Sequence, residues 1–243
     1  MKIRKPFTRK KINFFHNKII KKILLNFYSI HSFGKPGWLI YKELKYGGIS
    51  KNIKRLKVSQ KDPRTKKEIQ KGGMMGGDRM LYHGYAKKYM QYLSPYIKKS
   101  NIVLAEVGIL QGVGLAIWCD LFSKGKIIGF DIDLSHIKNN MDNLKKMGAF
   151  KKNKPELYDF DQFQDNTNYI KNILKDSKID ICIDDGLHSD ESILTTLKSM
   201  IPHLSKKFIY IIEDNNSVYN KIPSVFPGCN IDNKGELTIL TRK

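Results

Sequence analysis

Two apolar segments that each end in acidic residues constrain the fold of this chain more than any other feature. The first is Ile179-Asp-Ile-Cys-Ile-Asp-Asp-Gly-Leu-His188, and the second, after a helix-length gap, is Tyr210-Ile-Ile-Glu-Asp214. Their β-branched residues predict buried strands in the middle of a parallel sheet, where ligands bind at the carboxyl ends of the strands. We therefore predict an α/β fold that brings both acidic ends to one crevice.

The acidic ends also predict a cation site. Asp184, Asp185, Glu213 and Asp214 would lie close together, with His188 one loop away. Like charges at short range repel one another, so a cation or a shared proton must be present to make the cluster tolerable. Oxygen donors without cysteine favour a divalent ion such as magnesium or manganese over zinc.

Some of these residues also have a purely structural interpretation. An isolated Asp-Asp-Gly after a strand commonly forms a turn, and His188 directly precedes Ser189, a typical residue at the start of a helix. Asp133 could simply cap a helix that begins near Leu134, and Asp161 could be a solvated loop acid. For His188 the structural and the functional interpretation are compatible.

A glycine-containing loop follows another predicted strand. The strand 101–107 runs into Gly108-Ile-Leu-Gln-Gly-Val-Gly114 and then into a helix over residues 115–122. Glycines at this place allow a tight turn and close approach to a ligand. Their spacing does not fit the dinucleotide fingerprint Gly-x-Gly-x-x-Gly, and Glu106 would repel a pyrophosphate. The loop suits a ligand with a cationic end, such as the amino group and sulfonium of S-adenosylmethionine.

A second strand, Lys126-Ile-Ile-Gly-Phe-Asp131, ends in an acid about twenty residues further on. A carboxylate at this point of a nucleotide-binding unit can accept hydrogen bonds from both ribose hydroxyls. Each of these signals is weak alone, but their order and spacing together predict a nucleotide-binding half next to the acidic crevice.

Five motifs carry a resemblance to a known family. They are Glu106-Val-Gly-Ile-Leu-Gln-Gly-Val-Gly-Leu-Ala-Ile-Trp118, Gly129-Phe-Asp-Ile-Asp133, Phe160-Asp-Gln162, Ile183-Asp-Asp-Gly-Leu-His188 and Ile212-Glu-Asp214. In this order they resemble the class I methyltransferases of the metal-dependent, sugar-modifying branch. That branch includes the macrocin and mycinamicin O-methyltransferases, with cephalosporin-hydroxylase-like relatives. The chain departs from the pattern at Val113 and Gly114, where the family has Gly-Ser, and at Leu187, where it has serine.

The resemblance implies a fold, two cofactors and a set of site residues. The fold would be a Rossmann-like class I methyltransferase sheet with helices on both faces and a basic helical N-terminal extension. The cofactors would be S-adenosylmethionine and a divalent metal, Mg²⁺, held by Asp185, Glu213 and Asp214, with His188 as general base. We expect the cofactor-binding residues to be Glu106, Gly108, Gln111, Gly112, Asp131, Asp161, Gln162, Asp184 and His83.

The net charge of +21 is unevenly distributed along the chain. Residues 1–71 contain 21 Lys and Arg but three acids, whereas residues 72–243 contain 23 basic and 20 acidic side chains. We predict a basic N-terminal extension and arm over 1–71 and a methyltransferase domain over 72–243. Within the latter, the glycine-rich segment 72–77 and the residues that follow it, with the pair Asp78-Arg79, would form a lid, and Tyr82 or His83 would touch the cofactor. The lead-in helix that follows and ends near 98 would pack through Tyr89 and Tyr92.

Apolar residues recur at helical spacing in the extension. They are Ile12, Phe15, Ile19, Ile23, Phe27 and Ile30, and lysines lie mostly elsewhere around the same helix. Such a basic amphipathic helix could lie on an anionic membrane surface or strengthen contact with a phosphate-bearing substrate. It could equally pack its apolar stripe on the body of the protein or on a partner subunit.

Length and composition fit one globular core with an appendage, because 41% of the 243 residues are hydrophobic. Cys119, Cys182 and Cys229 show no metal-ligand spacing, which favours reduced structural thiols in a cytoplasmic protein. No transmembrane span is expected, since no run of about 18 apolar residues occurs. Lys21 and Lys22 interrupt the only apolar stretch that could have been a signal peptide.

The resemblance and these observations together predict a metal-dependent O-methyltransferase that acts on a hydroxyl of a sugar or glycan-type acceptor. Methyl transfer measured with and without a chelator would test this prediction. We expect a homo-oligomer located in the cytoplasm or peripherally at the inner membrane face. Two alternatives come from other classes. An RNA methyltransferase is favoured by the charge, but the basicity lies outside the catalytic half and nucleic acid is not the expected partner. A binding protein without catalysis could use the same fold.

Overall fold

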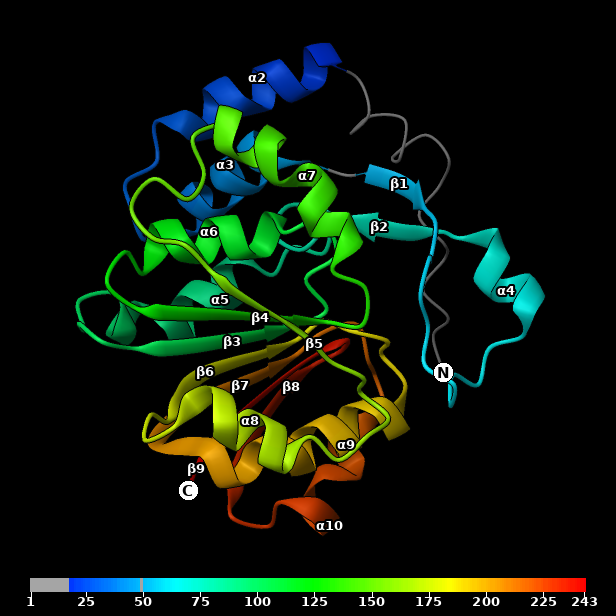
Figure 1. Ribbon diagram of the computed structural model, residues 1–243. Helices are drawn as coiled ribbons and strands as arrows, with labels where there is room; N and C mark the ends of the chain where they lie inside the picture. The colour runs from blue at the N-terminus through cyan, green and yellow to red at the C-terminus, as the bar shows by residue number, and fades with distance from the viewer. Residues whose placement is uncertain (1–17, 49) are drawn as a thin grey trace.

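A mixed seven-stranded sheet forms the centre of the protein (Figure 1). The computed structural model describes residues 18–48 and 50–243, with the side chains of 50–52 excepted. In spatial order the strands are β5 (Glu156–Asp159), β4 (Lys126–Asp131), β3 (Val103–Val107), β6 (Ile179–Asp184), β7 (Leu204–Ile212), β9 (Leu237–Arg242) and β8 (Cys229–Lys234). The first five are parallel, and β9 is antiparallel to both of its neighbours.

The order of the strands reverses next to β3. From β3 the chain moves outward through β4 to β5, and it then returns to place β6 on the other side of β3. In open α/β sheets the crevice at such a reversal is where ligands bind. The sheet therefore places the loops after β3, β4 and β6 around one position.

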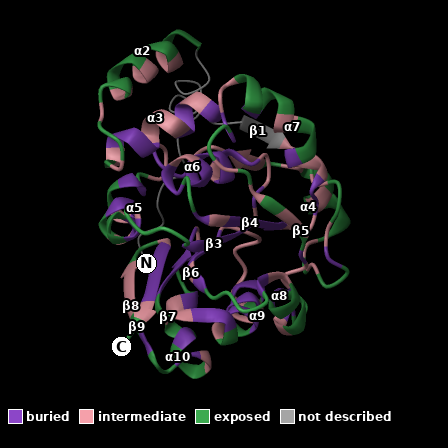
Figure 2. Ribbon diagram, turned by 60° about the vertical axis from the view of Figure 1, so that its left-hand side comes forward, coloured by how far each residue is buried: buried purple, intermediate pink, exposed green. Residues whose placement is uncertain are grey.

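Helices cover both faces of the sheet (Figure 1). On one face lie α5 (Ala86–Leu93), α6 (Val113–Leu121) and α7 (Ser135–Lys146), and on the other lie α8 (Thr167–Leu174), α9 (Asp190–Met200) and the short α10 (Ile222–Val225). Two apolar cores, one on each face, bury the β-branched residues of the central strands (Figure 2). Burial on both faces explains why these strands are apolar almost throughout.

The elements predicted from the sequence around the site are confirmed. β4 has the predicted bounds, β6 lies within the predicted segment 179–188, β3 begins two residues late, and α6 covers the predicted helix 115–122 except for its last residue. Ser189 caps α9, since its hydroxyl accepts a hydrogen bond from the amide of Ser192 at 3.1 Å. The closing strand β9 was predicted as well, over 237–240.

The N-terminal part of the described chain is not a separate body. It forms α2 (Lys18–Ser29), α3 (Pro36–Tyr46), β1 (Ser50–Ile53), α4 (Lys66–Lys71) and, beyond the predicted boundary, β2 (Met74–Gly76), which pairs with β1. Trp38, Leu39 and Tyr46 of α3 lie in the same apolar core as α5 and α6. A boundary after Lys71 therefore does not separate two cores.

The amphipathic helix is present as α2, and the predicted apolar positions Ile12 and Phe15 lie outside the described residues. In the part of the chain that the structure describes, none of the helices has the length and apolar character needed to cross a bilayer. All three cysteines are buried and unpaired, as expected for structural thiols.

Candidate active site

A cavity of about 350 Å³ opens at the carboxyl ends of β3, β4 and β6, at the reversal of strand order. Its walls include the loops after these strands, the 73–75 and 78–83 segments, and the arm over residues 55–64. This volume is within the range of small-molecule sites. The arm was predicted to be a linker, and its presence in the wall was not foreseen.

The glycine loop holds the two halves of the site together. Gly108 has a φ of +84°, and a Cβ at this position would collide with the carbonyl oxygen of Asp185 in the loop after β6. A side chain there would therefore push apart the loops that follow β3 and β6. Gly112 and Gln111 lie further along the same turn but do not line the cavity, and the carbonyl of Gln111 accepts a hydrogen bond from Asn140 at 2.9 Å.

Two predicted cofactor residues lie in the cavity wall. Asp131 ends β4, and its two carboxylate oxygens accept backbone amide hydrogens from Leu110 and Asp133, both at 2.9 Å. Burial raises the pKa of Asp131 despite these two hydrogen bonds. Asp161 follows β5 and accepts the hydroxyl hydrogen of Ser59 at 2.7 Å. Each carboxylate thus has a fixed orientation at the cavity.

Three other predicted cofactor residues do not present their polar groups to the cavity. Glu106 and Asp184 are almost completely buried and are absent from the wall. Gln162 does touch the cavity, but its amide donates to Asp184 at 2.8 Å and accepts from the amide of Leu187 at the same distance. Gln162 and Asp184 therefore stabilise the loop after β6 through hydrogen bonds on its buried side. Burial raises the pKa of Asp184 to about 7.

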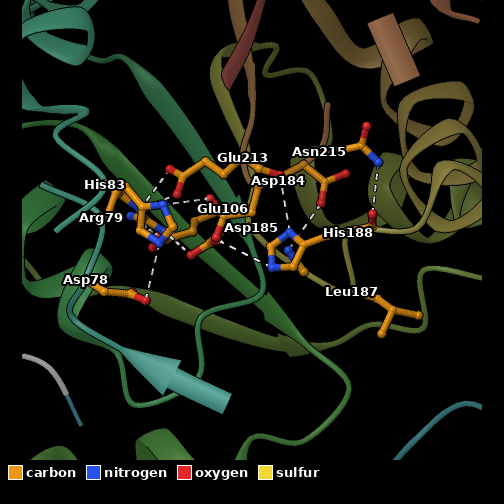
Figure 3. Close-up of polar contacts among 12 residues, drawn as sticks. Asp78, Arg79, His83, Glu106, Asp184, Asp185, Leu187, His188, Glu213 and Asn215 are labelled. Atoms are coloured by element: carbon orange, nitrogen blue, oxygen red, sulfur yellow. Dashed lines mark hydrogen bonds and ion pairs between the residues drawn. The ribbon is translucent and has the colours of Figure 1, made fainter. Parts of the chain in front are cut away.

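Arg79 is the centre of the acidic cluster (Figure 3). Its side chain is 9% exposed, and each nitrogen of the guanidinium faces a different carboxylate. Nη1 lies 2.7 Å from Glu106, Nη2 lies 2.6 Å from Asp185, and Nε lies 2.8 Å from Glu213. Charge-assisted pairs of this kind are the strong hydrogen bonds of a protein interior. The protein itself supplies a cation where the sequence predicted a metal.

Glu213 is consequently turned into the interior. Besides Arg79 it accepts a hydrogen bond from the hydroxyl of Tyr89, whose ring stacks on Trp118 at 5.5 Å between centroids. The guanidinium carbon of Arg79 lies 5.7 Å from the centre of the Trp118 ring. Burial raises the pKa of Glu213, and the charge of Arg79 opposes this shift. Glu213 therefore belongs to a buried network rather than to the cavity wall.

The second wall of the cavity carries Asp185, His188 and Asp214. Potential ligand atoms of these three side chains lie within 4.8 Å of one another. Nδ1 of His188 lies 3.2 Å from the carbonyl oxygen of Glu213, which can only accept, so Nδ1 carries a proton, and in the neutral ring Nε2 is the acceptor. Nε2 lies 4.0 Å from Asp185 Oδ1.

His188 and Asp214 have φ values of +65° and +55°. Non-glycine residues in this region are strained, and such strain is concentrated at functional sites. Asn215 holds the two loops together, because its side-chain amide donates to the carbonyl of His188 at 2.9 Å. Leu187, which stands where the family has serine, projects away from the acidic cluster (Figure 3).

His83, which is predicted to touch the cofactor, lines the cavity. Its ring nitrogens lie 3.6 Å from Asp78 and 3.5 Å from Asp214. Burial lowers the pKa of His83, but the hydrogen bond with Asp78 and the charge of Asp214 outweigh that effect and raise it. Tyr85 donates its hydroxyl hydrogen to Asp214 at 2.8 Å, so two residues of the predicted lid orient this acid.

Of the three predicted metal ligands, Asp185 and Asp214 are the two that line the cavity, and their carboxylates fit a divalent cation. Among the described residues, the groups of close ligand atoms that include Asp185 or Asp214 do not include Glu213. Asp185 and Asp214 both face the cavity, whereas the carboxylate of Glu213 is engaged by Arg79 and Tyr89. Arg79 carries one positive charge and already faces three acids, of which Asp185 is one, so it does not balance the charges of Asp185 and Asp214 together. The fit is therefore to Asp185 and Asp214.

Sequence reasoning missed Arg79, Ser59 and Asn215. Arg79 was recognised only as part of an Asp-Arg pair within the lid, and Ser59 lies in a segment without periodicity. Asn215 was missed as well. It directly follows the Ile-Glu-Asp motif, and a polar residue next to a predicted site motif could have indicated a role in the site.

The strand order, with a final antiparallel strand inserted beside β7, and the cavity at the reversal define a class I methyltransferase fold. Comparison with solved structures agrees. The methyltransferase MycE of the mycinamycin biosynthetic pathway, in complex with Mg, SAH and mycinamycin VI, has a TM-score of 0.52 and 18% identity, over 67% of this chain and 50% of that chain. A second structure of MycE with Mg and SAH has a TM-score of 0.51 and 19% identity over the same shares.

The sequence is similar to two curated sugar O-methyltransferases. One is the 8-demethyl-8-alpha-L-rhamnosyl tetracenomycin-C 2'-O-methyltransferase of Streptomyces olivaceus, 24% identical over 153 residues, which are 59% of this chain and 36% of the relative. The other is the mycinamicin VI 2''-O-methyltransferase of Micromonospora griseorubida, 25% identical over 146 residues, or 56% and 33%. No protein-family model matches the chain. The predicted resemblance is confirmed, and the chain spans about a third of the length of these relatives.

Proposed function

We propose that this protein transfers a methyl group from S-adenosylmethionine to a hydroxyl of a sugar or glycan-type acceptor. The observation that carries the proposal is a single cavity with two different walls. One wall holds Asp131 and Asp161, and the other holds Asp185, His188 and Asp214. The names of the two curated relatives, both 2-position sugar O-methyltransferases, support the acceptor class.

The first wall suits an adenosine-containing, positively charged ligand. Asp131 would accept hydrogen bonds from the ribose hydroxyls, and Asp161 would lie near the adenine amino group. Glu106 is buried, paired with Arg79 and absent from the cavity wall, so it does not act on the ligand directly. Asp131 ends β4 and Asp185 directly follows β6, and these two cavity acids favour a ligand with a cationic end between them.

The second wall suits removal of a proton from a hydroxyl. Nε2 of His188 would accept the proton while the acceptor oxygen forms its bond to the methyl carbon. The carbon–sulfur bond breaks in the same step, and its electron pair stays on sulfur, which converts the sulfonium to a thioether. Asn215 and the carbonyl of Glu213 orient the His188 loop and ring, so the base is positioned before the acceptor binds.

Asp185 and Asp214 would hold the divalent cation. Such an ion, when bound, lowers the pKa of a coordinated hydroxyl and fixes its orientation. Tyr85 and His83 keep Asp214 turned toward the cavity, and Arg79 keeps Asp185 in place through the oxygen that does not face His188.

The test is methyl transfer from labelled S-adenosylmethionine to a panel of rhamnosides, nucleotide sugars and RNA, with and without chelator. We expect sugar labelling that chelator removes and magnesium restores. His188→Ala should reduce turnover by about 100-fold or more, the usual contribution of a general base, while magnesium affinity measured by calorimetry stays unchanged. Asp185→Asn should weaken magnesium binding, and the exposed Asp142→Asn serves as the charge-matched control.

Two results would overturn the proposal. Calorimetric binding of NAD without binding of S-adenosylmethionine would exclude the cofactor. Labelling of RNA in place of every sugar, with strong salt dependence, would exclude the acceptor class.

A further inference from the structure

The outward side of α2 is apolar and faces solvent. α2 lies on α3 at the edge of the molecule, and none of its residues is fully buried (Figures 1 and 2). Ile23 and Phe27 are each 60% exposed, and in the turns that follow the helix Ile30 is 79% and Phe33 is 53% exposed. We call the exposed side chains of Ile23, Phe27 and Ile30 the α2 apolar stripe. Phe33 also meets the ring of Trp38 in α3 edge-on, with 5.0 Å between the centroids.

The stripe is not the side by which α2 packs on the body. Leu24 and Tyr28 of the same helix are partly buried, whereas Ile23, Phe27 and Ile30 are at least 60% exposed. Packing on the body, one of the explanations left open by the sequence, therefore does not account for the stripe.

The charged side chains of the segment that carries the stripe are of one sign. The first acidic residue of the sequence is Glu43, and its carboxylate is buried against the amides of Met80 and Leu81. Lys18, Lys22 and Lys35 are exposed on or beside α2. A segment that combines exposed apolar side chains with lysines and carries no acid of its own is complementary to an anionic lipid surface.

We propose that the α2 apolar stripe docks on the surface of an anionic lipid bilayer. The apolar side chains would enter the boundary between headgroups and acyl chains, and the lysines would contact phosphate groups. A second copy of this chain fits the stripe less well. A symmetric contact through α2 would bring two basic segments together without any acid on either helix to offset their repulsion.

The test measures sedimentation of the full-length protein with vesicles of 30% phosphatidylglycerol in phosphatidylcholine, and with pure phosphatidylcholine. We expect binding to the anionic vesicles, weaker binding at high salt, and little binding to neutral vesicles. Phe27→Glu/Ile30→Glu should weaken the binding at least tenfold. Leu56→Glu/Tyr169→Glu is the matched control, because it places the same charge at exposed apolar positions outside α2.

The substituted side chains of α2 are exposed, so both double variants should keep the thermal unfolding profile of the unaltered protein. Equal vesicle binding by the α2 variant and its control would overturn the proposal. A dimer in sedimentation equilibrium that Phe27→Glu/Ile30→Glu dissociates, without any vesicle binding by the unaltered protein, would overturn it in favour of a second copy. Neither result depends on methyltransferase activity, so failure of the docking proposal is distinguishable from failure of the proposed reaction.

Discussion

Removal of the Arg79 charge should be among the most destabilising single changes in this protein. Arg79→Met keeps much of the side-chain volume but leaves Glu106, Asp185 and Glu213 without their shared cation. Breaking a buried ion pair from one side costs about 3–5 kcal/mol, because the remaining charge is uncompensated. Three carboxylates share this guanidinium, and its stacking on Trp118 is lost as well, so we expect the upper part of that range.

The measurement is urea unfolding followed by circular dichroism, with the free energy of unfolding extrapolated to water. The matched control is Lys145→Met, which removes an exposed pair with Asp142 and should cost less than about 1 kcal/mol. Arg79→Lys should lie between the two, since an ammonium group cannot face three carboxylates in the planar arrangement of a guanidinium.

A second variant keeps the prediction testable if Arg79→Met does not fold. Arg79→Met/Glu213→Gln removes one of the stranded charges while keeping an acceptor for Tyr89. It should therefore be more stable than Arg79→Met alone. The reasoning is refuted if Arg79→Met lies within about 1 kcal/mol of the unaltered protein, because the carboxylates must then have another counter-charge, such as a bound cation.

Three other predictions follow from single residues. Asp131→Ala should lower the affinity for S-adenosylmethionine tenfold or more in calorimetry, a loss of about 1.4 kcal/mol, and an unchanged affinity would remove Asp131 from the site. Gly108→Ala should destabilise the fold by at least about 1–3 kcal/mol from backbone strain, whereas Gly228→Ala, which meets open space and has no positive φ, should be nearly neutral. Burial raises the pKa of Glu43 to about 7, above its value of 4.5 in the unfolded chain. The contribution of Glu43 to stability is therefore fully present below about pH 4.5 and is lost as the pH rises to about 7. Over that interval the free energy of unfolding should fall with a slope of up to about 1.4 kcal/mol per pH unit. Glu43→Gln should make the free energy of unfolding less dependent on pH in the same interval.

The sequence predicted the sheet well because its signals are local. β-branched runs that end in acids, as in β6 and β4, determine both the strand and the end at which its functional residues lie. Ser189 likewise marks the start of α9 through its own hydroxyl. These local patterns predict the strands and the helix start without any information about the residues that pack against them in the folded protein.

The roles of the acids could not be predicted in the same way. Glu106, Asp184 and Glu213 occupy motif positions, but whether a carboxylate faces a cavity or an interior cation depends on residues far away in the chain. Arg79 is 27 residues from Glu106 and 134 from Glu213. Since no local pattern couples such positions, a buried counter-charge and a bound metal are indistinguishable from sequence alone.

The contacts of the arm determine how far the chain can be truncated from its N-terminus while the cavity stays intact. Ser59, Lys57 and Lys61 are bonded to Asp161, Asp159 and the carbonyl of Phe163, all at the carboxyl end of β5 or just beyond it. A fragment that begins at residue 72, where the charge becomes balanced, would lose one side of the cavity and the α3 part of the core. The smallest fragment with an intact site must start ahead of α3, so the catalytic unit is larger than its motifs indicate.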